Sequence, residues 1–303
     1  MKTSTPVVAL PGTVNLFVNS VCNFCCKHCY ATFQDIRSPA PPKLREADAR
    51  EIIRQIATEP LPPNISARKI TFVGGEPTLC PFLPSLVADA KQSGLVTAVI
   101  TNGLTATPHY LKQFTGMLDW VGLSIDALTP AVNLRIGRAT QSGVALTAEQ
   151  YLDRVRWIRD IGAKLKINTV VSALNCDADL SAFITEANPV RWKLLQVTPM
   201  AGQNDHAIAA LQIQRFTFEA FVARHRSVTE SGITLIPEPV EVIQGSYVMI
   251  SPDGRFIDNS QGRHRYSSRI LERGLRDAFQ EVAFDNSKFE NRGGNYNPIT
   301  GGK

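Results

Sequence analysis

Short runs of β-branched and other apolar residues recur along the chain and predict six β-strands. Each run has the length and composition of a buried strand, and glycine, proline or polar residues bound it. The six runs occupy residues 13–18, 69–73, 97–101, 120–124, 164–171 and 191–197.

Helical periodicity fills the segments between several of these strands. Residues 44–59, 82–93 and 147–162 carry apolar positions three and four apart, and Gly94 and Gly162 are placed to end the last two helices. Parallel strands need a helical crossover, so this alternation predicts an α/β fold. Six such units predict a partial (βα)6 barrel with its chemistry at the carboxyl ends of the strands.

The pattern changes towards the end of the chain. Residues 248–257 predict a β-hairpin around a Pro-Asp-Gly turn, a helix follows near 274–284, and the last residues are polar and rich in glycine. The chain therefore divides into three predicted parts. They are an N-terminal tail (1–12), a barrel core (13–200) and a C-terminal extension (201–303).

Composition narrows the class of protein. The 303 residues are 44% hydrophobic and 19% charged, which is typical of a globular chain. The net charge of +5 is scattered without a run of like charges, so we expect no nucleic-acid partner. No window approaches the roughly 18 apolar residues of a membrane span, and the start of the chain lacks a secretory apolar region. We therefore expect a cytoplasmic protein with no membrane partner.

Four of the six cysteines lie within eight positions, 22–29. Cys80 and Cys176 are isolated and are expected to be buried apolar residues. A tight cluster in a long chain indicates metal or redox chemistry. One interpretation is a four-thiolate zinc site, although its two cysteine pairs would be unusually close. The other is a C-x3-C-x2-C site that binds three irons of a [4Fe–4S] cluster and leaves the fourth iron open.

The C-x3-C-x2-C spacing, followed by a tyrosine and placed after the first predicted strand, resembles the radical S-adenosylmethionine (SAM) superfamily. The resemblance implies that Cys22, Cys26 and Cys29 hold the cluster, while Cys25 is a spectator. It also implies that SAM chelates the open iron and is cleaved to a 5′-deoxyadenosyl radical. The SAM contacts that it implies are Tyr30, Gly74, Gly75, Glu76, Asn102, Ser124 and Arg138. Without the cysteine loop, a turn or surface role would explain these residues equally well.

Cationic residues alternate with apolar ones on two predicted neighbouring strands. Lys164, Lys166 and Asn168 share one face of the fifth strand. Arg191 and Lys193 share one face of the sixth. Cationic faces turned into a barrel predict an anionic ligand, because lysine and arginine bind phosphate. The alternative is a pair of solvated edge strands.

Four segments together resemble the viperin family over about residues 14–296. They are 133–138, 164–168, 188–193 and 292–296. This resemblance implies a lyase that converts a nucleoside triphosphate (CTP, UTP or GTP) to its 3′-deoxy-3′,4′-didehydro analogue. The 5′-deoxyadenosyl radical abstracts the ribose 4′ hydrogen and the 3′ hydroxyl leaves as water. The sequence lacks the amphipathic membrane helix of the animal enzymes, which fits the prokaryotic members that act in antiphage defence.

The same resemblance implies roles at the substrate. Tyr247, as a proton or hydrogen-atom relay, and Lys166 would be catalytic, with a buried structural tyrosine as the alternative for Tyr247. The tail from Arg292 would cover the nucleotide. The implied substrate-binding residues are Asn15, Lys166, Asn168, Arg191, Lys193, Arg269 and Arg292. Arg263 and Arg265 compete with Arg269 for this role.

Partners and rival activities complete the predictions. We expect a monomer that receives electrons from a flavodoxin or ferredoxin. The GTP-cyclising radical enzyme of molybdopterin biosynthesis carries a second, C-terminal cysteine triad, and this chain has no cysteine after Cys176. A radical SAM enzyme of another phosphorylated substrate, or an iron–sulfur nucleotide sensor without turnover, remains as an alternative.

Overall fold

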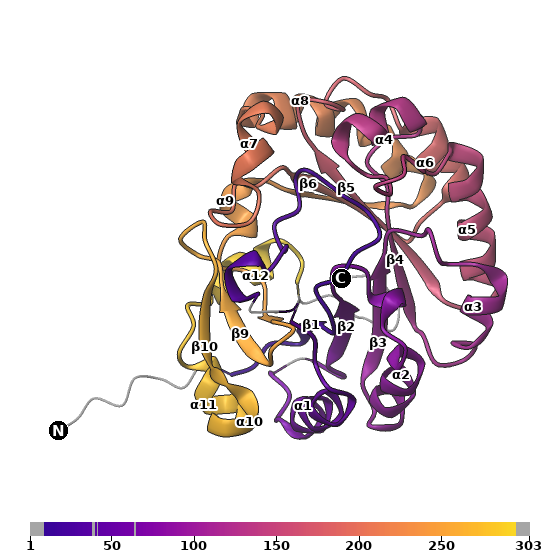
Figure 1. Cartoon of the computed structure of the whole chain (residues 1–303). Helices are drawn as coiled ribbons and strands as arrows, with labels where there is room; N and C mark the ends of the chain where they lie inside the picture. The colour runs from indigo at the N-terminus through magenta and orange to yellow at the C-terminus, as the bar shows by residue number, and fades with distance from the viewer. Residues whose placement is uncertain (1–8, 38–39, 41, 64, 295–303) are drawn as a thin grey trace.

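The computed structural model describes residues 9–294 except 38–39, 41 and 64. The described residues form one curved ten-stranded sheet in the order β10-β9-β8-β1-β2-β3-β4-β5-β6-β7 (Figure 1). The strands are β1 (Thr13–Phe17), β2 (Lys69–Val73), β3 (Val96–Thr101), β4 (Trp120–Ser124), β5 (Lys164–Val171), β6 (Arg191–Gln196), β7 (Thr234–Glu238), β8 (Met249–Ile250), β9 (Arg255–Asp258) and β10 (Arg265–Arg269). Neighbours from β8 to β7 are parallel, whereas β9 and β10 run antiparallel.

Helices cover the outer side of the curve, with α1, α2, α5 and α6 following the strands around it (Figure 1). The helices are α1 (Glu46–Thr58), α2 (Leu83–Gln92), α3 (Pro108–Lys112), α4 (Pro130–Ile136), α5 (Ala148–Asp160), α6 (Ser181–Ala187), α7 (Asp205–Leu211), α8 (Arg215–Arg224), α9 (Val240–Ile243), α10 (Ile270–Arg273), α11 (Leu275–Phe279) and α12 (Asn286–Asn291). Short 3-10 turns occupy Gln34–Ile36, Pro77–Leu79 and Arg226–Ser231. The predicted α/β partial barrel is therefore confirmed, and its parallel run is longer than six strands.

The two faces of β2 show how the sequence separates core from cavity. Ile70 and Phe72 are fully buried in the main apolar core beneath the helices. Lys69, Thr71 and Val73 point to the other face and line an internal cavity. Successive side chains of a strand alternate between faces, so one short run builds both.

Most predicted boundaries agree with the structure. The strands predicted at 69–73, 120–124 and 164–171 coincide with β2, β4 and β5, and β8 and β9 form the predicted hairpin. Thr147 begins α5 with a reciprocal capping box, in which its hydroxyl accepts from the Gln150 amide. The helix predicted near 274–284 is shorter, because α11 ends at Phe279.

Strand β7 was absent from the prediction because it contains Pro237. Proline cannot donate to a strand ladder and usually marks an edge or a non-strand segment. Here Pro237 is tolerated because β7 is an edge strand, paired only with β6 among the described strands.

The segment predicted as a C-terminal extension supplies β7 and β8, which join the same sheet as the core strands. The division of the chain at residue 200 stays a prediction. The covering tail falls largely at 295–303, outside the described residues, and so do positions 1–8.

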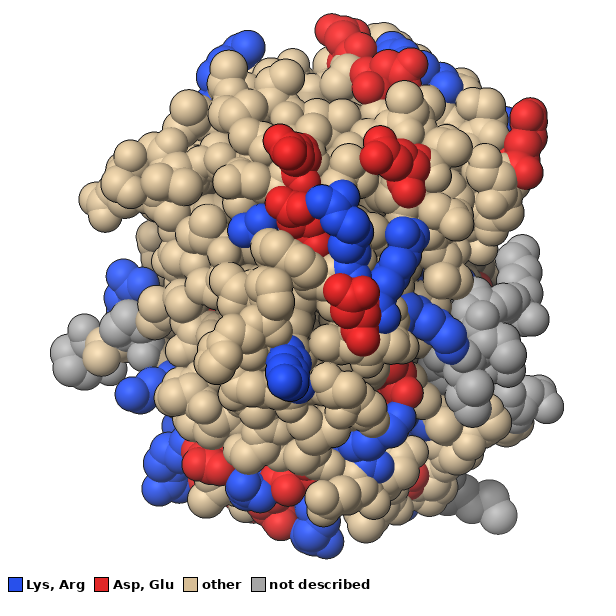
Figure 2. Space-filling view, turned by 90° about the vertical axis from the view of Figure 1, so that its right-hand side faces the viewer, with Lys and Arg blue, Asp and Glu red and all other residues tan. Residues whose placement is uncertain are grey.

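Charged side chains of both signs are interspersed on the face shown in Figure 2, and no single-sign patch dominates it. Within the described part of the chain, no helix combines the length and apolar character that crossing a membrane requires.

Candidate functional site

One cavity of about 630 Å³ lies inside the curve of the sheet. Its volume is in the range of small-molecule and cofactor sites. Strands β1 to β6 and β8 all contribute lining residues. Among the lining residues are these predicted site residues: Asn15, Cys22, Cys26, Cys29, Tyr30, Gly74, Gly75, Glu76, Asn102, Ser124, Arg138, Lys166, Asn168, Arg191, Lys193, Tyr247 and Arg292.

Arg269 is the predicted site residue that lies elsewhere. It ends the outermost strand, β10, its side chain is 51% exposed, and it pairs with Glu272 at 3.9 Å. Its rivals Arg263 and Arg265 are also exposed and do not line the cavity. The prediction failed because no pattern in the sequence indicated that this segment forms the outer antiparallel edge. We therefore remove all three from the site.

The cysteine loop is held by main-chain contacts to the end of α4. The Cys25 amide donates to the carbonyls of Gly137 and Ala139 at 3.2 and 3.0 Å, and the Lys27 amide donates to that of Ile136 at 2.9 Å. A Cβ at Gly137 would lie 2.3 Å from the Cys25 carbonyl oxygen, and this glycine has a φ of +84°. Only glycine therefore allows this close approach.

The Gly-Gly-Glu turn after β2 fixes the other side of the loop. The Gly75 amide donates to the Asn19 carbonyl at 2.9 Å and the Glu76 amide to the Val21 carbonyl at 2.8 Å. A Cβ on Gly75 would lie 2.3 Å from the Val21 oxygen. The close approach for which this glycine is needed is thus to the cysteine loop itself.

Glu76 ties this turn to the end of β3. Its carboxylate accepts from the Asn102 amide at 2.8 Å and from the hydroxyls of Thr78 and Thr101, both at 2.7 Å. Burial raises its pKa, and these hydrogen bonds offset only part of that effect. The Asn102 side chain donates to Asn23 at 2.7 Å and approaches the Cys22 sulfur at 3.9 Å. Asn102 therefore supports the cysteine loop directly.

The three cysteines fit a cluster better than a single metal ion. Among the described residues, no three His, Cys, Asp or Glu side chains converge closely enough to hold one ion. A four-thiolate zinc site requires such convergence, whereas a cubane binds each cysteine through a different iron. Burial raises the pKa of Cys22 to about 11 and that of Cys26 to about 12. These thiols are thus not poised as free thiolates, and iron would have to displace their protons.

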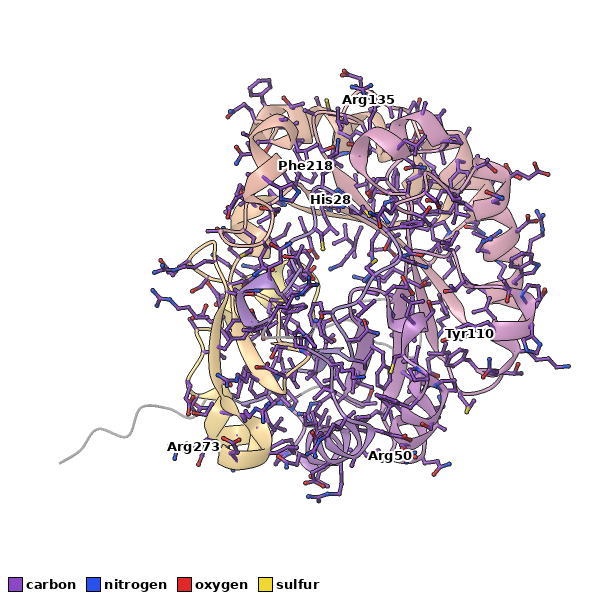
Figure 3. The ribbon with its side chains drawn as sticks, viewed as in Figure 1. His28, Arg50, Tyr110, Arg135, Phe218 and Arg273 are labelled. Carbon is purple, nitrogen blue, oxygen red and sulfur yellow. The ribbon has the colours of Figure 1, made fainter. Side chains whose placement is uncertain are left out.

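A buried network of charged and polar side chains, Arg138, Asp126 and His28, adjoins the cysteine loop. Arg138 Nε donates to Asp126 Oδ2 at 2.5 Å, and His28 Nε2 lies 3.5 Å from the same oxygen. Burial lowers the pKa of Arg138, but Asp126 and Cys26 raise it by more, so the guanidinium stays protonated. Burial lowers the pKa of His28 to about 4, which keeps the ring neutral. Figure 3 places His28 on the inner side of the sheet, while Arg50 and Arg273 lie at the rim.

Asp126 was missed by the sequence analysis. It is fully buried and follows β4 by two residues, and its Oδ1 accepts from the Val170 amide at 2.8 Å. A carboxylate just beyond the carboxyl end of a barrel strand was the signal that could have indicated it.

A second group of cations lies deeper in the same cavity. Lys69 begins β2 and Arg191 begins β6, so both lie at the amino ends of their strands. Lys69 is four residues before the end of β2, a distance of about 13 Å along the strand. The group consists of Lys69, Lys166, Arg191, Lys193 and Arg292, all of which line the cavity.

The two predicted cationic faces thus meet in one place. On the neighbouring strands β5 and β6, Lys166 lies beside Arg191 and Asn168 lies beside Lys193, and all four line the cavity. Lys164, which starts β5, instead lies with its Nζ 5.4 Å from the centre of the Trp120 ring. The side-chain amide oxygen of Asn168, Oδ1, is buried without a hydrogen-bond partner among the described residues, and the residue is only 8% exposed. It is therefore an acceptor available to a ligand donor.

Lys69 was also missed, although the alternation in KITFV was a usable signal. Burial lowers its pKa to about 7, with further lowering by Arg191 and Arg292. Burial and the neighbouring lysines lower the pKa of Lys166 well below its usual range. Cations crowded in this way favour a polyanionic ligand.

Glu238, at the end of β7, is the third residue that sequence reasoning missed. It is fully buried, forms ion pairs with Lys193 and Arg292, and accepts a hydrogen bond from the Tyr247 hydroxyl. Burial raises its pKa, but Lys193 and Arg292 lower it by more, to about 2. Lys193 also donates to the Tyr247 hydroxyl at 2.7 Å. Because β7 was not predicted, nothing placed this carboxylate beside the site.

Comparisons with known proteins agree with this geometry. The profile of the Radical SAM superfamily matches residues 16–181. The chain is 43% identical over 296 residues to an S-adenosylmethionine-dependent nucleotide dehydratase of Lacinutrix mariniflava, covering 97% of this chain and 60% of that protein. It is 39% identical to the protein of the same description from Flammeovirga pacifica, covering 94% and 95% of the two chains.

Solved structures show the same fold at low sequence identity. Streptococcus suis SuiB bound to S-adenosylmethionine superposes with a TM-score of 0.68 at 14% identity, over 94% of this chain and 68% of that one. The structure of anSMEcpe with bound AdoMet and a peptide gives 0.65 at 14% identity, over 93% and 81%.

Proposed function

The chain belongs to the radical SAM superfamily and, within it, to the viperin-like S-adenosylmethionine-dependent nucleotide dehydratases, and on this basis we propose that it dehydrates a nucleoside triphosphate. The product would be the 3′-deoxy-3′,4′-didehydro analogue of CTP, UTP or GTP, a chain terminator suited to antiphage defence. One observation carries the proposal. The cavity that holds the three cysteines also holds a deep group of lysines and arginines.

A [4Fe–4S] cluster and SAM are the cofactors of this superfamily and of this chain. When bound, they supply an electron and a cleavable sulfonium, and hence the group that abstracts the ribose 4′ hydrogen. We propose that Cys22, Cys26 and Cys29 hold the cluster. The SAM-facing residues would be Tyr30, Gly74, Gly75, Glu76, Asn102, Ser124 and Arg138. The Arg138 guanidinium, kept charged by Asp126, suits the methionine carboxylate.

The chain's own residues would place the nucleotide between the cysteine loop and the amino ends of the strands. Lys69, Lys166, Arg191, Lys193 and Arg292 would bind the triphosphate at the amino ends of the strands. The unpartnered side-chain Oδ1 of Asn168 would accept from a ribose hydroxyl, and Asn15 on β1 lies in the same lining. The ribose would then lie between the phosphates and the cysteine loop, where its 4′ hydrogen is within reach of the radical chemistry.

Dehydration also needs a proton for the departing 3′ hydroxyl. Tyr247 and Lys193, which share a hydrogen bond of 2.7 Å, carry exchangeable protons on the cavity wall. We propose that Tyr247 delivers this proton, with Lys166 as a second catalytic cation. A flavodoxin or ferredoxin would supply electrons to a monomeric, cytoplasmic enzyme.

The proposal is tested by anaerobic incubation of the reconstituted, reduced protein with SAM and one of CTP, UTP, GTP or ATP. Mass spectrometry would detect loss of one water from a single triphosphate together with an equal amount of 5′-deoxyadenosine. Deoxyadenosine without an altered nucleotide would contradict the proposed substrate. Nucleotide binding without deoxyadenosine would favour the sensor alternative.

A further inference from the structure

Glu238 occupies an unusual place behind the cavity wall. It is the last residue of β7, its exposed fraction is zero, and it is not among the cavity-lining residues. Its three partners, Lys193, Tyr247 and Arg292, do line the cavity. Glu238 therefore contacts the site through other side chains.

A buried carboxylate is costly to keep in a fold unless cations and donors compensate it. Glu238 has two ion pairs and one hydroxyl donor, and all three come from different elements. Lys193 lies on β6, Tyr247 precedes β8, and Arg292 follows α12. One carboxylate thus joins three separate parts of the site.

The geometry around Tyr247 leaves its hydroxyl little freedom. The hydroxyl donates to Glu238 and accepts from Lys193 Nζ at 2.7 Å. The Arg292 guanidinium lies 3.7 Å from the centre of its ring. The ring is covered and both sides of the hydroxyl are occupied, so the phenol is held in a single orientation.

Glu238 also balances charge among the phosphate-binding cations. Among the described residues, Glu238 is the carboxylate that pairs with Lys193 and Arg292, and without its charge these two cations would face Lys69, Lys166 and Arg191. Repulsion among them would favour other side-chain positions before a nucleotide arrives.

From these contacts we propose that Glu238 is a positioning residue for dehydration, which orients Tyr247 and Lys193 for proton delivery. The inference rests on the proposed function. In that reaction the C3′–O bond breaks, the oxygen leaves as water with one added proton, and one electron comes from the electron donor. The Tyr247 O–H turns from Glu238 to the departing oxygen and gives it the proton, Lys193 Nζ passes a proton to the tyrosine oxygen, and solvent then reprotonates Lys193.

The test is Glu238→Gln, which keeps the size of the side chain and removes its charge. We expect kcat for the dehydrated nucleotide to fall at least about tenfold, while KM for the triphosphate changes less than about threefold. Cleavage of SAM should fall less than product formation, so the ratio of 5′-deoxyadenosine to product should rise at least about fivefold. The matched control is Glu241→Gln, an exposed glutamate three residues along that pairs with Arg215 and should change neither quantity.

A double-mutant cycle separates positioning from a merely structural role. If Glu238 acts through Tyr247, adding Glu238→Gln to Tyr247→Phe should change the deoxyadenosine-to-product ratio by less than about twofold. Equal effects in both backgrounds, or a wild-type ratio in Glu238→Gln, would overturn the inference. Wild-type protein that dehydrates no triphosphate would instead overturn the proposed function.

Glu238→Asp is the second variant should the glutamine protein fail to fold. It keeps the charge on a shorter side chain, so it should give an intermediate ratio with normal iron content. A wild-type ratio in Glu238→Asp together with a misfolded Glu238→Gln would show that the residue serves folding alone.

Discussion

The two halves of the cavity are held in place by different means. Around the cysteine loop, main-chain hydrogen bonds and glycines fix the positions, and the neighbouring acids Glu76 and Asp126 are saturated by fixed partners. Around the deep cations, the positions are fixed by ion pairs and hydrogen bonds between side chains, and Glu238 is at their centre. The cysteine half thus has a frame of main-chain contacts, whereas the proposed phosphate half is held by contacts between charged side chains.

The largest effect should come from the cysteines themselves. Cys26→Ala should lose the cluster and lower activity by roughly a hundredfold or more, because a cubane held by two thiolates is unstable. Cys25→Ala is the matched control, since the loop is anchored there by its main chain, and it should keep its iron and activity. Iron content, the visible absorbance spectrum and 5′-deoxyadenosine yield are the measurements. Loss of iron from Cys25→Ala would show that the ligand assignment is wrong.

The main-chain frame is tested by Gly137→Ala. The new Cβ would lie 2.3 Å from the Cys25 carbonyl oxygen, which the backbone cannot relieve cheaply. We expect a loss of roughly 3 kcal/mol or more in the free energy of unfolding, with reduced cluster content. Gly162→Ala has a similar φ of +79° and no neighbour within 4 Å. Gly162→Ala should lower the free energy of unfolding by only about 1–2 kcal/mol. Equal denaturation midpoints would refute the proposed frame.

The deep cations are compared by two substitutions on one strand. Lys166→Met should raise KM for the triphosphate about tenfold to a hundredfold, the worth of a charged hydrogen bond. Lys164→Met changes a residue that packs on Trp120 outside the cavity and should leave KM nearly unchanged. Steady-state kinetics with the nucleotide that the enzyme dehydrates measures KM for both variants. Similar KM values for both variants would remove β5 from the phosphate site.

The smallest effect should be a dependence of binding on pH. The pKa of Lys69 and that of Lys193 are each lowered to about 7, and phosphate prefers the protonated amine. Affinity should therefore fall several-fold as the pH rises through about 7 towards 9, a range in which the phosphate charge changes little. Equilibrium dialysis with labelled nucleotide measures this, and Lys69→Met should flatten the profile. A flat wild-type profile would contradict protonation-dependent binding.

Local signals in the sequence were enough for the barrel and the cysteine half. Period-two runs located β2, β4 and β5 without error, and the cysteine spacing together with the resemblance that it carries predicted Cys22, Cys26 and Cys29 as cluster ligands. The same alternation placed Lys166 and Lys193 on inward faces. These features depend on residues near one another in the chain.

What sequence reasoning missed depends on contacts between distant segments. Glu238 joins Arg292 across 54 positions through a strand that contains a proline, and no local pattern indicates it. Arg269 was misplaced because its strand pairs at the outer edge rather than near the cavity. Gly75 was predicted only as a SAM contact, and no local pattern indicated that the main chain at Val21 approaches it closely.

The pairing of β1 with β8 has a consequence for how the chain is made. The strand that leads into the cysteine loop has β2 on one side, but on the other it pairs through Asn15 and Leu16 with Met249 and Ile250. At ordinary rates of translation, roughly 12 to 47 s separate the synthesis of these two segments. Throughout that interval the nascent cysteine strand has an unpaired edge, a surface on which other chains can add. Insertion of iron and sulfide into a finished site must therefore wait until most of the polypeptide has left the ribosome.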